Sequence, residues 1–239
     1  METNKELRFE NGRISLMASQ TSCKLYFYGD IVSSVWDKWG NDDKCPQDVA
    51  DLLNAIPNDA QLDIYINSGG GDVHAGIAIY QQLTRRTGVN VIHVDGLAAS
   101  IASVIAMAGD DIIVPASAQI MIHKPWSLVG GNADELRKTA DILDLCQQSI
   151  VNIYMGKTLK GIEQETIESM MNDETWLTGS DAAQFFKITV DDVPAAAACR
   201  SAYFGKYKHA PKFTQTAEDA KQDEIERMKI QLELMTLDI

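Results

Sequence analysis

The sequence predicts an α/β domain built on a largely parallel sheet. Short runs of β-branched and aromatic residues alternate with helical patterns, as they do in repeated β-α-β units. The predicted strands are residues 24–28, 62–66, 90–94, 111–114 and 119–122, and the helical patterns between them are roughly 73–86 and 101–108. Because ligands bind at the carboxyl edge of parallel strands, we expect the functional residues in the loops at that edge.

Composition and charge narrow the class of partner. The chain has 239 residues, of which 45% are hydrophobic, and this is normal for the packed core of one large or two small domains. The formal net charge of −13 repels nucleic acid and anionic membrane over most of the surface. The expected ligand is therefore a polypeptide, a basic partner or a small molecule.

Cysteine usage and the N-terminus indicate the compartment. The four cysteines form no CxxC pair and have no paired histidine spacing, which argues against a metal site or a disulfide framework and suits a reducing compartment. The first residues are charged and no long apolar run follows, so we expect neither secretion nor a membrane span. The cytoplasm is the expected location.

A long helix is predicted in the second half of the chain. Asn132 followed by Glu135 is a capping-box pattern, and the helical pattern runs to about Tyr154. The apolar residues one heptad apart on it are Leu136, Leu143 and Ile150. Such a helix is either packed on the core or an oligomerisation arm.

The chain changes character after about Pro194. An alanine run leads into a polar, irregular stretch, and a short helix is predicted over about 224–237. The residues at heptad-like spacing in it are Ile225, Met228, Leu232 and Met235. We therefore expect three parts: an N-terminal segment 1–20, a main domain 21–193, and a linker with a C-terminal helix over 194–239.

The first candidate functional segment is INSGGGDVHAG, directly after a predicted strand. Three consecutive glycines allow close backbone approach, and a helix starts just beyond them. Such loops often hold phosphate, but this one lacks the GK[ST] of a P-loop and the GxGxxG of a dinucleotide site. The remaining role is to expose backbone N–H groups, as an oxyanion hole requires.

The second segment is DGLAASIAS, in which a strand-like run stops at Gly96 and a serine follows before a helix. Ser100 in this position projects its hydroxyl at the sheet edge, and the Ile101 N–H lies at a helix N-terminus, where it can stabilise a negative oxygen. The segment resembles a nucleophile elbow without matching GxSxG. The alternative is that Ser100 is a plain helix N-cap.

The third segment is MIHKPW, in which His123 ends an apolar strand. The proline after Lys124 keeps the chain extended, so we expect the imidazole at the same sheet edge as Ser100. The alternative is a histidine with a purely structural role. The other histidines have weaker contexts, in a helix, a strand and the tail: His74, His93 and His209.

In this order and at these intervals, the segments resemble the caseinolytic ClpP-type serine peptidases. The matching stretches are INSGGGDVHAGIAIYQQL, DGLAASIAS, MIHKP and ETWLTGSDAAQFF. The resemblance spans about residues 25–193. It implies an α/β ClpP/crotonase-like fold with repeated βαβ units and a protruding handle helix, and we expect a C-terminal helical tail in addition. It also implies that Ser100 is the nucleophile and His123 the general base, with the N–H groups of Gly71 and Ile101 as oxyanion donors.

The acid of the implied triad is Glu174, which stands where the family usually has Asp. Asp173, one residue earlier, is the reserve, and the alternative is that both are surface charges.

VGGNADEL resembles the glycine-rich strand before the family's handle helix. Gly130 and Gly131, together with Gly70, are therefore the expected substrate-binding backbone. The family's usual proline in the oxyanion loop is Gly69 here, which gives the loop more freedom.

The resemblance implies a serine endopeptidase that needs no cofactor or metal and forms a homo-oligomeric ring, either a heptamer or a stacked double ring. The N-terminus, ETWLT and the tail look more like phage-encoded head maturation, or prohead, proteases. Those relatives imply capsid or scaffolding proteins as substrates and the host cytoplasm or a virion precursor as the location. Whether an AAA+ unfoldase feeds the ring stays open.

Three alternatives remain. A crotonase-type acyl-CoA enzyme would use the same oxyanion hole without the Ser100/His123 pair, but anionic CoA suits an acidic protein poorly. A catalytically silent ring subunit would keep the fold, and the Glu at position 174 and the looser Gly69 loop are its only support. A general ATPase-dependent ClpP peptidase would keep the chemistry and change the substrate.

Overall fold

The computed structural model describes residues 22–191, 201 and 203–210, and everything below concerns these residues. Those up to His209 belong to one compact unit. A seven-stranded sheet has the order β1-β2-β3-β4-β7, with β5 paired to β3 and β6 paired to β5. All pairings are parallel except that of β5 with β6. The predicted α/β class with a largely parallel sheet is confirmed.

The strands and helices predicted within the described residues are present, and apart from the end of β3 their ends shift only slightly. The strands are β1 Ser22–Phe27, β2 Gln61–Ser68, β3 Asn90–Ala99, β4 Asp111–Pro115, β5 Gln119–Ile122, β6 Thr175–Thr178 and β7 Thr189–Asp191. The helices are α1 Pro46–Ala55, α2 Val73–Thr84, α3 Ile101–Ala106, α4 Ala133–Lys157, α5 Gln164–Asn172 and α6 Gly179–Ala182, with 3-10 turns at Val35–Asp37 and Phe204–Lys206.

The strand expected to stop at Gly96 continues to Ala99, and this corrects the sequence prediction. Leu97 to Ala99 pair in parallel with Gln119 to Met121 of β5. The small side chains after Gly96 belong to the core, where Ala98 and Ala99 are fully buried. Ser100 therefore follows the strand directly.

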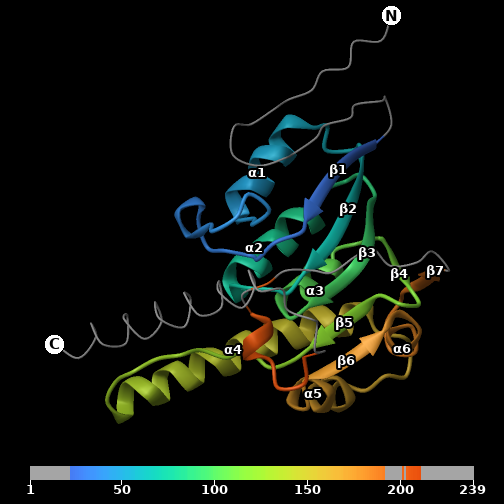
Figure 1. Cartoon of the computed structure of the whole chain (residues 1–239). Helices are drawn as coiled ribbons and strands as arrows, with labels where there is room; N and C mark the ends of the chain where they lie inside the picture. The colour runs from blue at the N-terminus through green and yellow to red at the C-terminus, as the bar shows by residue number, and fades with distance from the viewer. Residues whose placement is uncertain (1–21, 192–200, 202, 211–239) are drawn as a thin grey trace, which may run out of the picture. The chain divides into compact units, whose positions relative to one another are not determined.

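The core lies between the sheet and the helices that cover it. Along the first part of β2 and of β3 every second side chain is buried, as expected for strands with one face on the core, and the last three residues of each strand are all buried. Figure 1 shows α1 and α2 together on one face of β1, β2 and β3. The fully buried aliphatic side chains of β2 and β3 include Leu62, Ile64, Ile66, Ile92 and Val94.

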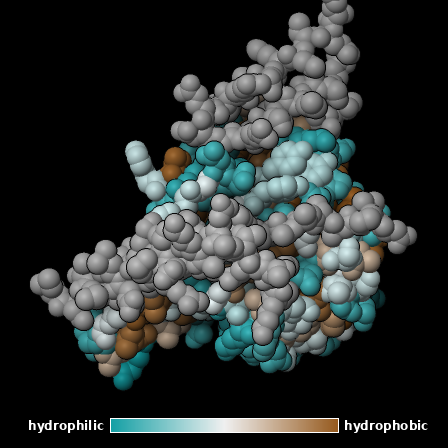
Figure 2. All heavy atoms as spheres, viewed as in Figure 1, coloured by the Kyte–Doolittle hydropathy of each residue, from teal (hydrophilic) through white to brown (hydrophobic). Residues whose placement is uncertain are grey.

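Helix α4 begins as predicted, with a complete capping box. The Asn132 side chain accepts the N–H groups of Asp134 and Glu135, and the Glu135 carboxylate accepts the Asn132 N–H at 2.7 Å. The C-terminal half of α4 has one face buried in the core, whereas its N-terminal half extends past the sheet (Figure 1). Exposed apolar residues gather there and in the preceding segment, giving the apolar surface seen in Figure 2. They are Leu128, Val129, Leu136, Ile142 and Leu145.

Several sequence predictions fall outside the described residues. They are the N-terminal segment 1–20 and the terminal helix containing Ile225, Met228, Leu232 and Met235. The boundary between a main domain and a linker at 193/194 stays a prediction. Within the described part of the chain, no helix is long and apolar enough to span a membrane.

Candidate active site

Ser100 stands at a sharp turn between β3 and α3. Its backbone has φ 54° and ψ −128°, a left-handed φ that costs an ordinary residue roughly 1–2 kcal/mol. The Ser100 N–H donates to Met121 O at 2.9 Å, and the hydroxyl makes no helix-cap hydrogen bond. The hydroxyl instead lies 2.7 Å from His123 Nε2. A strained strand-to-helix turn that presents a serine hydroxyl to a base has the geometry of a nucleophile elbow.

His123 reaches the same edge because it follows β5, which pairs with the last residues of β3. Burial lowers the pKa of His123 to about 4, although the nearby Glu174 carboxylate opposes this shift. The imidazole is therefore neutral at neutral pH. A neutral ring whose Nε2 faces a hydroxyl can accept that hydroxyl's proton.

A buried serine ties the two strands together beneath this pair. Ser103 is fully buried, and its hydroxyl lies 2.6 Å from Ser100 O, 3.1 Å from Met121 O and 2.8 Å from Tyr154 OH. These contacts fix the backbone carbonyl of Ser100 against the strand that leads to His123. The sequence analysis did not single out Ser103, whose position inside a small-residue helix carries no special signal.

The glycine loop is anchored by Ile31. The Ile31 N–H donates to Gly70 O at 2.8 Å, and the Asp72 N–H donates to Ile31 O at 2.7 Å. Neither of these two hydrogen bonds uses the Gly71 N–H. Gly71 has φ 147°, and a Cβ on it would lie 2.0 Å from Ile31 O. Gly71 lines the same cavity as Ser100, and Ile101, directly after the serine, is the first residue of α3.

Glu174 is near His123 but is hydrogen-bonded elsewhere. It is 8% exposed, and its carboxylate accepts the N–H groups of His209 at 2.6 Å and Lys208 at 2.8 Å. Burial alone would raise the pKa of Glu174, but these bonds, the Trp176 indole and the charge of His123 lower it. Within the described residues, no hydrogen bond joins Glu174 to His123.

Asp173 lies at the end of α5 and is exposed. Of the two candidate acids, only Glu174 is buried, and its charge raises the pKa of His123. Its backbone is held in the left-handed region, at φ 50°.

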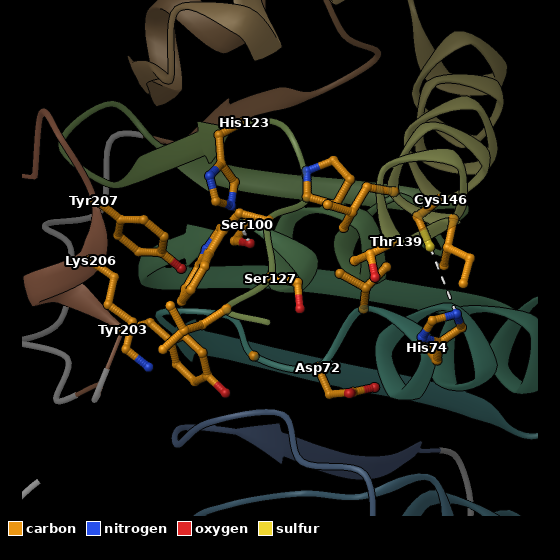
Figure 3. A pocket seen from close by; sticks show the side chains of 17 residues that line it. Asp72, His74, Ser100, His123, Ser127, Thr139, Cys146, Tyr203, Lys206 and Tyr207 are labelled. Atoms are coloured by element: carbon orange, nitrogen blue, oxygen red, sulfur yellow. Dashed lines mark hydrogen bonds between the residues drawn. The ribbon is translucent and has the colours of Figure 1, made fainter. Parts of the chain in front are cut away.

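A cavity of about 380 Å³ opens beside the pair (Figure 3). Its lining includes Gly71, Ser100 and His123 together with α4 side chains such as Thr139 and Cys146. Gly130 and Gly131 are exposed and are not in that lining. Among the described residues, the segment that contains them is not assigned to a strand.

Three further lining residues come from beyond the predicted domain: Tyr203, Lys206 and Tyr207. In Figure 3 the Tyr207 hydroxyl points toward Ser100. The sequence analysis placed this stretch in a linker, since a polar and irregular sequence gives no periodic signal. Its contacts are long-range and are visible only in the folded chain.

Comparison with known proteins identifies the family of the chain. Residues 41–189 match the Clp protease family, and the match contains the glycine loop, Ser100, His123 and Glu174. The chain belongs to the Clp protease family. The α/β fold with a parallel-rich sheet fits that membership.

Curated relatives are ATP-dependent Clp protease proteolytic subunits. Subunit 3 of Streptomyces coelicolor is 33% identical over 137 residues, which cover 56% of this chain and 62% of that protein. Subunit 1 of Chlamydia abortus is 36% identical over 125 residues, covering 50% and 64%. The subunit of Ligilactobacillus salivarius is 33% identical over 150 residues, covering 61% and 75%. The chain thus spans just under two thirds of the first two relatives.

Proposed function

We propose that this Clp-family chain is a serine endopeptidase that cleaves peptide bonds through an acyl-enzyme on Ser100. The observation that carries the proposal is the 2.7 Å approach of Ser100 Oγ to His123 Nε2 at a strained strand-to-helix turn. The glycine loop that shares the cavity with Ser100 and the start of α3 at Ile101 support it, because acyl transfer needs N–H donors for the developing oxyanion.

In the proposed mechanism, Ser100 Oγ attacks the scissile carbonyl carbon and its proton moves to His123 Nε2. The carbonyl oxygen becomes an oxyanion that accepts the N–H groups of Gly71 and Ile101. When the C–N bond breaks, His123 gives the proton to the leaving amine. Water then attacks the ester carbonyl carbon and gives a proton to His123. When the C–Oγ bond breaks, His123 passes that proton to Ser100 Oγ, and the carboxylic acid product is released.

Glu174 is the proposed acid that stabilises the imidazolium, with Asp173 as the reserve. The burial of Glu174 and its electrostatic effect on His123 support this choice. Gly70, Gly130 and Gly131 are proposed to bind the substrate backbone. Gly130 and Gly131 would do so by pairing with the substrate backbone, which would be added beside their segment as a strand.

We also propose a homo-oligomeric ring and, from the resemblance to phage prohead proteases, capsid or scaffold proteins as substrates in the cytoplasm or in a virion precursor. The exposed apolar side chains of α4, which include Leu136, Ile142 and Leu145, support assembly, since such surface is normally covered. The main alternative is a catalytically silent ring subunit. It is favoured by one observation, that Glu174 does not hydrogen-bond to His123.

Labelling with a fluorophosphonate, measured by intact mass, tests the proposal. The full-length wild type should gain one adduct, and Ser100→Ala should gain none. Ser149→Ala is the matched control, because Ser149 is exposed on α4 and its hydroxyl bonds only within that helix. A folded wild type that stays unlabelled after long incubation would favour the silent subunit.

The pH dependence of labelling is a second prediction. The base must be neutral, and the pKa of His123 is lowered to about 4, so the rate should stay level as the pH falls through 6.5 and decline only near 4. The measurement is the labelling rate against pH, with circular dichroism at each point to monitor folding. A decline centred near 6.5 in folded protein would show that burial does not control this histidine.

A further inference from the structure

A segment after the family match lies over the candidate active site. Ser201 and residues 203–209, which we call the strap, follow the matched region that ends at residue 189. They come from far along the chain, yet they contact the catalytic serine, the histidine, the acid and the glycine loop. These contacts involve three separate parts of the strap.

The first contact is made by Tyr207 at the Ser100/His123 pair. Tyr207 is 7% exposed, and its hydroxyl donates to Gly69 O and also interacts with the Ser100 hydroxyl. Its ring packs edge-on against His123, with the ring centroids 5.1 Å apart, and lies near Trp176. A substrate must bring its carbonyl carbon to Ser100 Oγ from this same cavity, so the phenol stands where the substrate has to approach.

The second contact is at Glu174. The N–H groups of Lys208 and His209 each occupy one oxygen of the Glu174 carboxylate, at 2.8 and 2.6 Å. Hydrogen bonds from two N–H groups stabilise the charged carboxylate in its present position. Because these N–H groups hold the Glu174 carboxylate, the strap competes with His123 for it. The strap thus affects the acid as well as the nucleophile.

The third contact anchors the start of the strap. The Ser201 hydroxyl donates to Asp30 Oδ1 at 2.6 Å and accepts the Tyr203 N–H at 3.1 Å. Ser201 also lies directly on Gly69, where a Cβ would be 2.2 Å from Ser201 Oγ. The strap therefore fits the glycine loop only because position 69 has no side chain.

We propose that the strap is an autoinhibitory segment. When it is docked, Tyr207 excludes a polypeptide from Ser100 and the Lys208 and His209 amides withhold Glu174 from His123. It must leave before a substrate binds. This inference rests on the proposed peptidase function, which it deepens by naming how the site is regulated. Docking and release of the strap form a two-state equilibrium, so weakening one contact raises the open fraction and the reaction rate together.

The test compares labelling rates of full-length variants with a fluorophosphonate. Tyr207→Ala should react about tenfold faster than wild type, and Tyr207→Phe, which loses only the hydroxyl contacts, should show a smaller increase. Tyr28→Ala is the matched control, because Tyr28 directly follows β1, is 37% exposed and bonds to Asp95. It should react at the wild-type rate.

Hydrogen exchange gives a readout that does not depend on activity. In full-length Ser100→Ala, the Lys208 and His209 amides should exchange at least about tenfold slower than in a free peptide, and Tyr207→Ala should remove this protection. Exchange at the free-peptide rate would overturn the inference, because the strap would not be docked. Equal or slower labelling of Tyr207→Ala would also overturn it, by showing that the strap leaves the site accessible or completes it.

The two failures are distinguishable. In one outcome the Lys208 and His209 amides are protected, but neither wild type nor any Tyr207 variant is labelled. The proposed peptidase function then fails, and the inference fails with it because there is no activity to inhibit. If wild type is labelled and the Tyr207 variants react no faster, only the autoinhibition is wrong.

Discussion

Ser100→Ala and His123→Ala should each slow peptide hydrolysis by at least about a thousandfold, and the double variant should be no slower than either single variant. The physical reason is that one proton passes between these two side chains, which lie 2.7 Å apart. Without the imidazole the hydroxyl is a poor nucleophile, and without the hydroxyl the imidazole has nothing to activate. Either loss therefore removes the same step.

The measurement is the hydrolysis of a fluorogenic peptide by full-length protein, with Ser149→Ala as the control. Intact far-UV circular dichroism should accompany each loss, since neither side chain is part of the buried core. Losses that multiply in the double variant would mean that the two residues act independently. In that case the proposed proton transfer between them is wrong.

The strands and the Ser100/His123 pair could be predicted because their signals are local. Runs of β-branched residues locate the strands, and a parallel sheet brings the carboxyl ends of neighbouring strands to one edge. Ser100 follows β3 and His123 follows β5, and these strands pair at Leu97 to Ala99. The contact between two residues far apart in the sequence therefore follows from two local patterns and one topological rule.

The surroundings of Glu174 could not be predicted in the same way. Its hydrogen-bond donors are backbone N–H groups of Lys208 and His209, and every residue except proline carries such a group. No side-chain pattern marks which of them will be used. Ser201 and Tyr207 were missed for a related reason, because the strap has no periodic apolar face and its docking depends on the shape of a site made by other segments.

The glycine loop shows where a sequence motif needs structure to become specific. Three consecutive glycines predicted that the backbone of the loop lies close to other atoms, but the sequence did not identify those atoms. Gly69 meets Ser201, Gly70 lies against Ser100, and Gly71 meets Ile31 O. Each glycine thus has its own neighbour, so a methyl group should have a different consequence at each position.

At position 71 that consequence should be a loss of catalysis by about 10²–10³, the usual effect of removing one oxyanion donor. A Cβ on Gly71 would lie 2.0 Å from Ile31 O, and the φ of 147° is unfavourable for alanine. Ile31 cannot retreat, because it is fully buried and bonded to both Gly70 and Asp72. The loop must move instead, and it carries the Gly71 N–H away from Ser100.

The matched control for Gly71→Ala is Gly156→Ala in α4, where an added Cβ meets nothing within 4 Å. That change should leave the hydrolysis rate unaltered and can raise stability by up to about 1 kcal/mol, because alanine favours a helix more than glycine does. Thermal denaturation of both variants separates a displaced loop from a destabilised fold. If Gly71→Ala keeps the full rate, the oxyanion is held by Ile101 and other donors, and the glycine loop serves packing against Ile31 rather than catalysis.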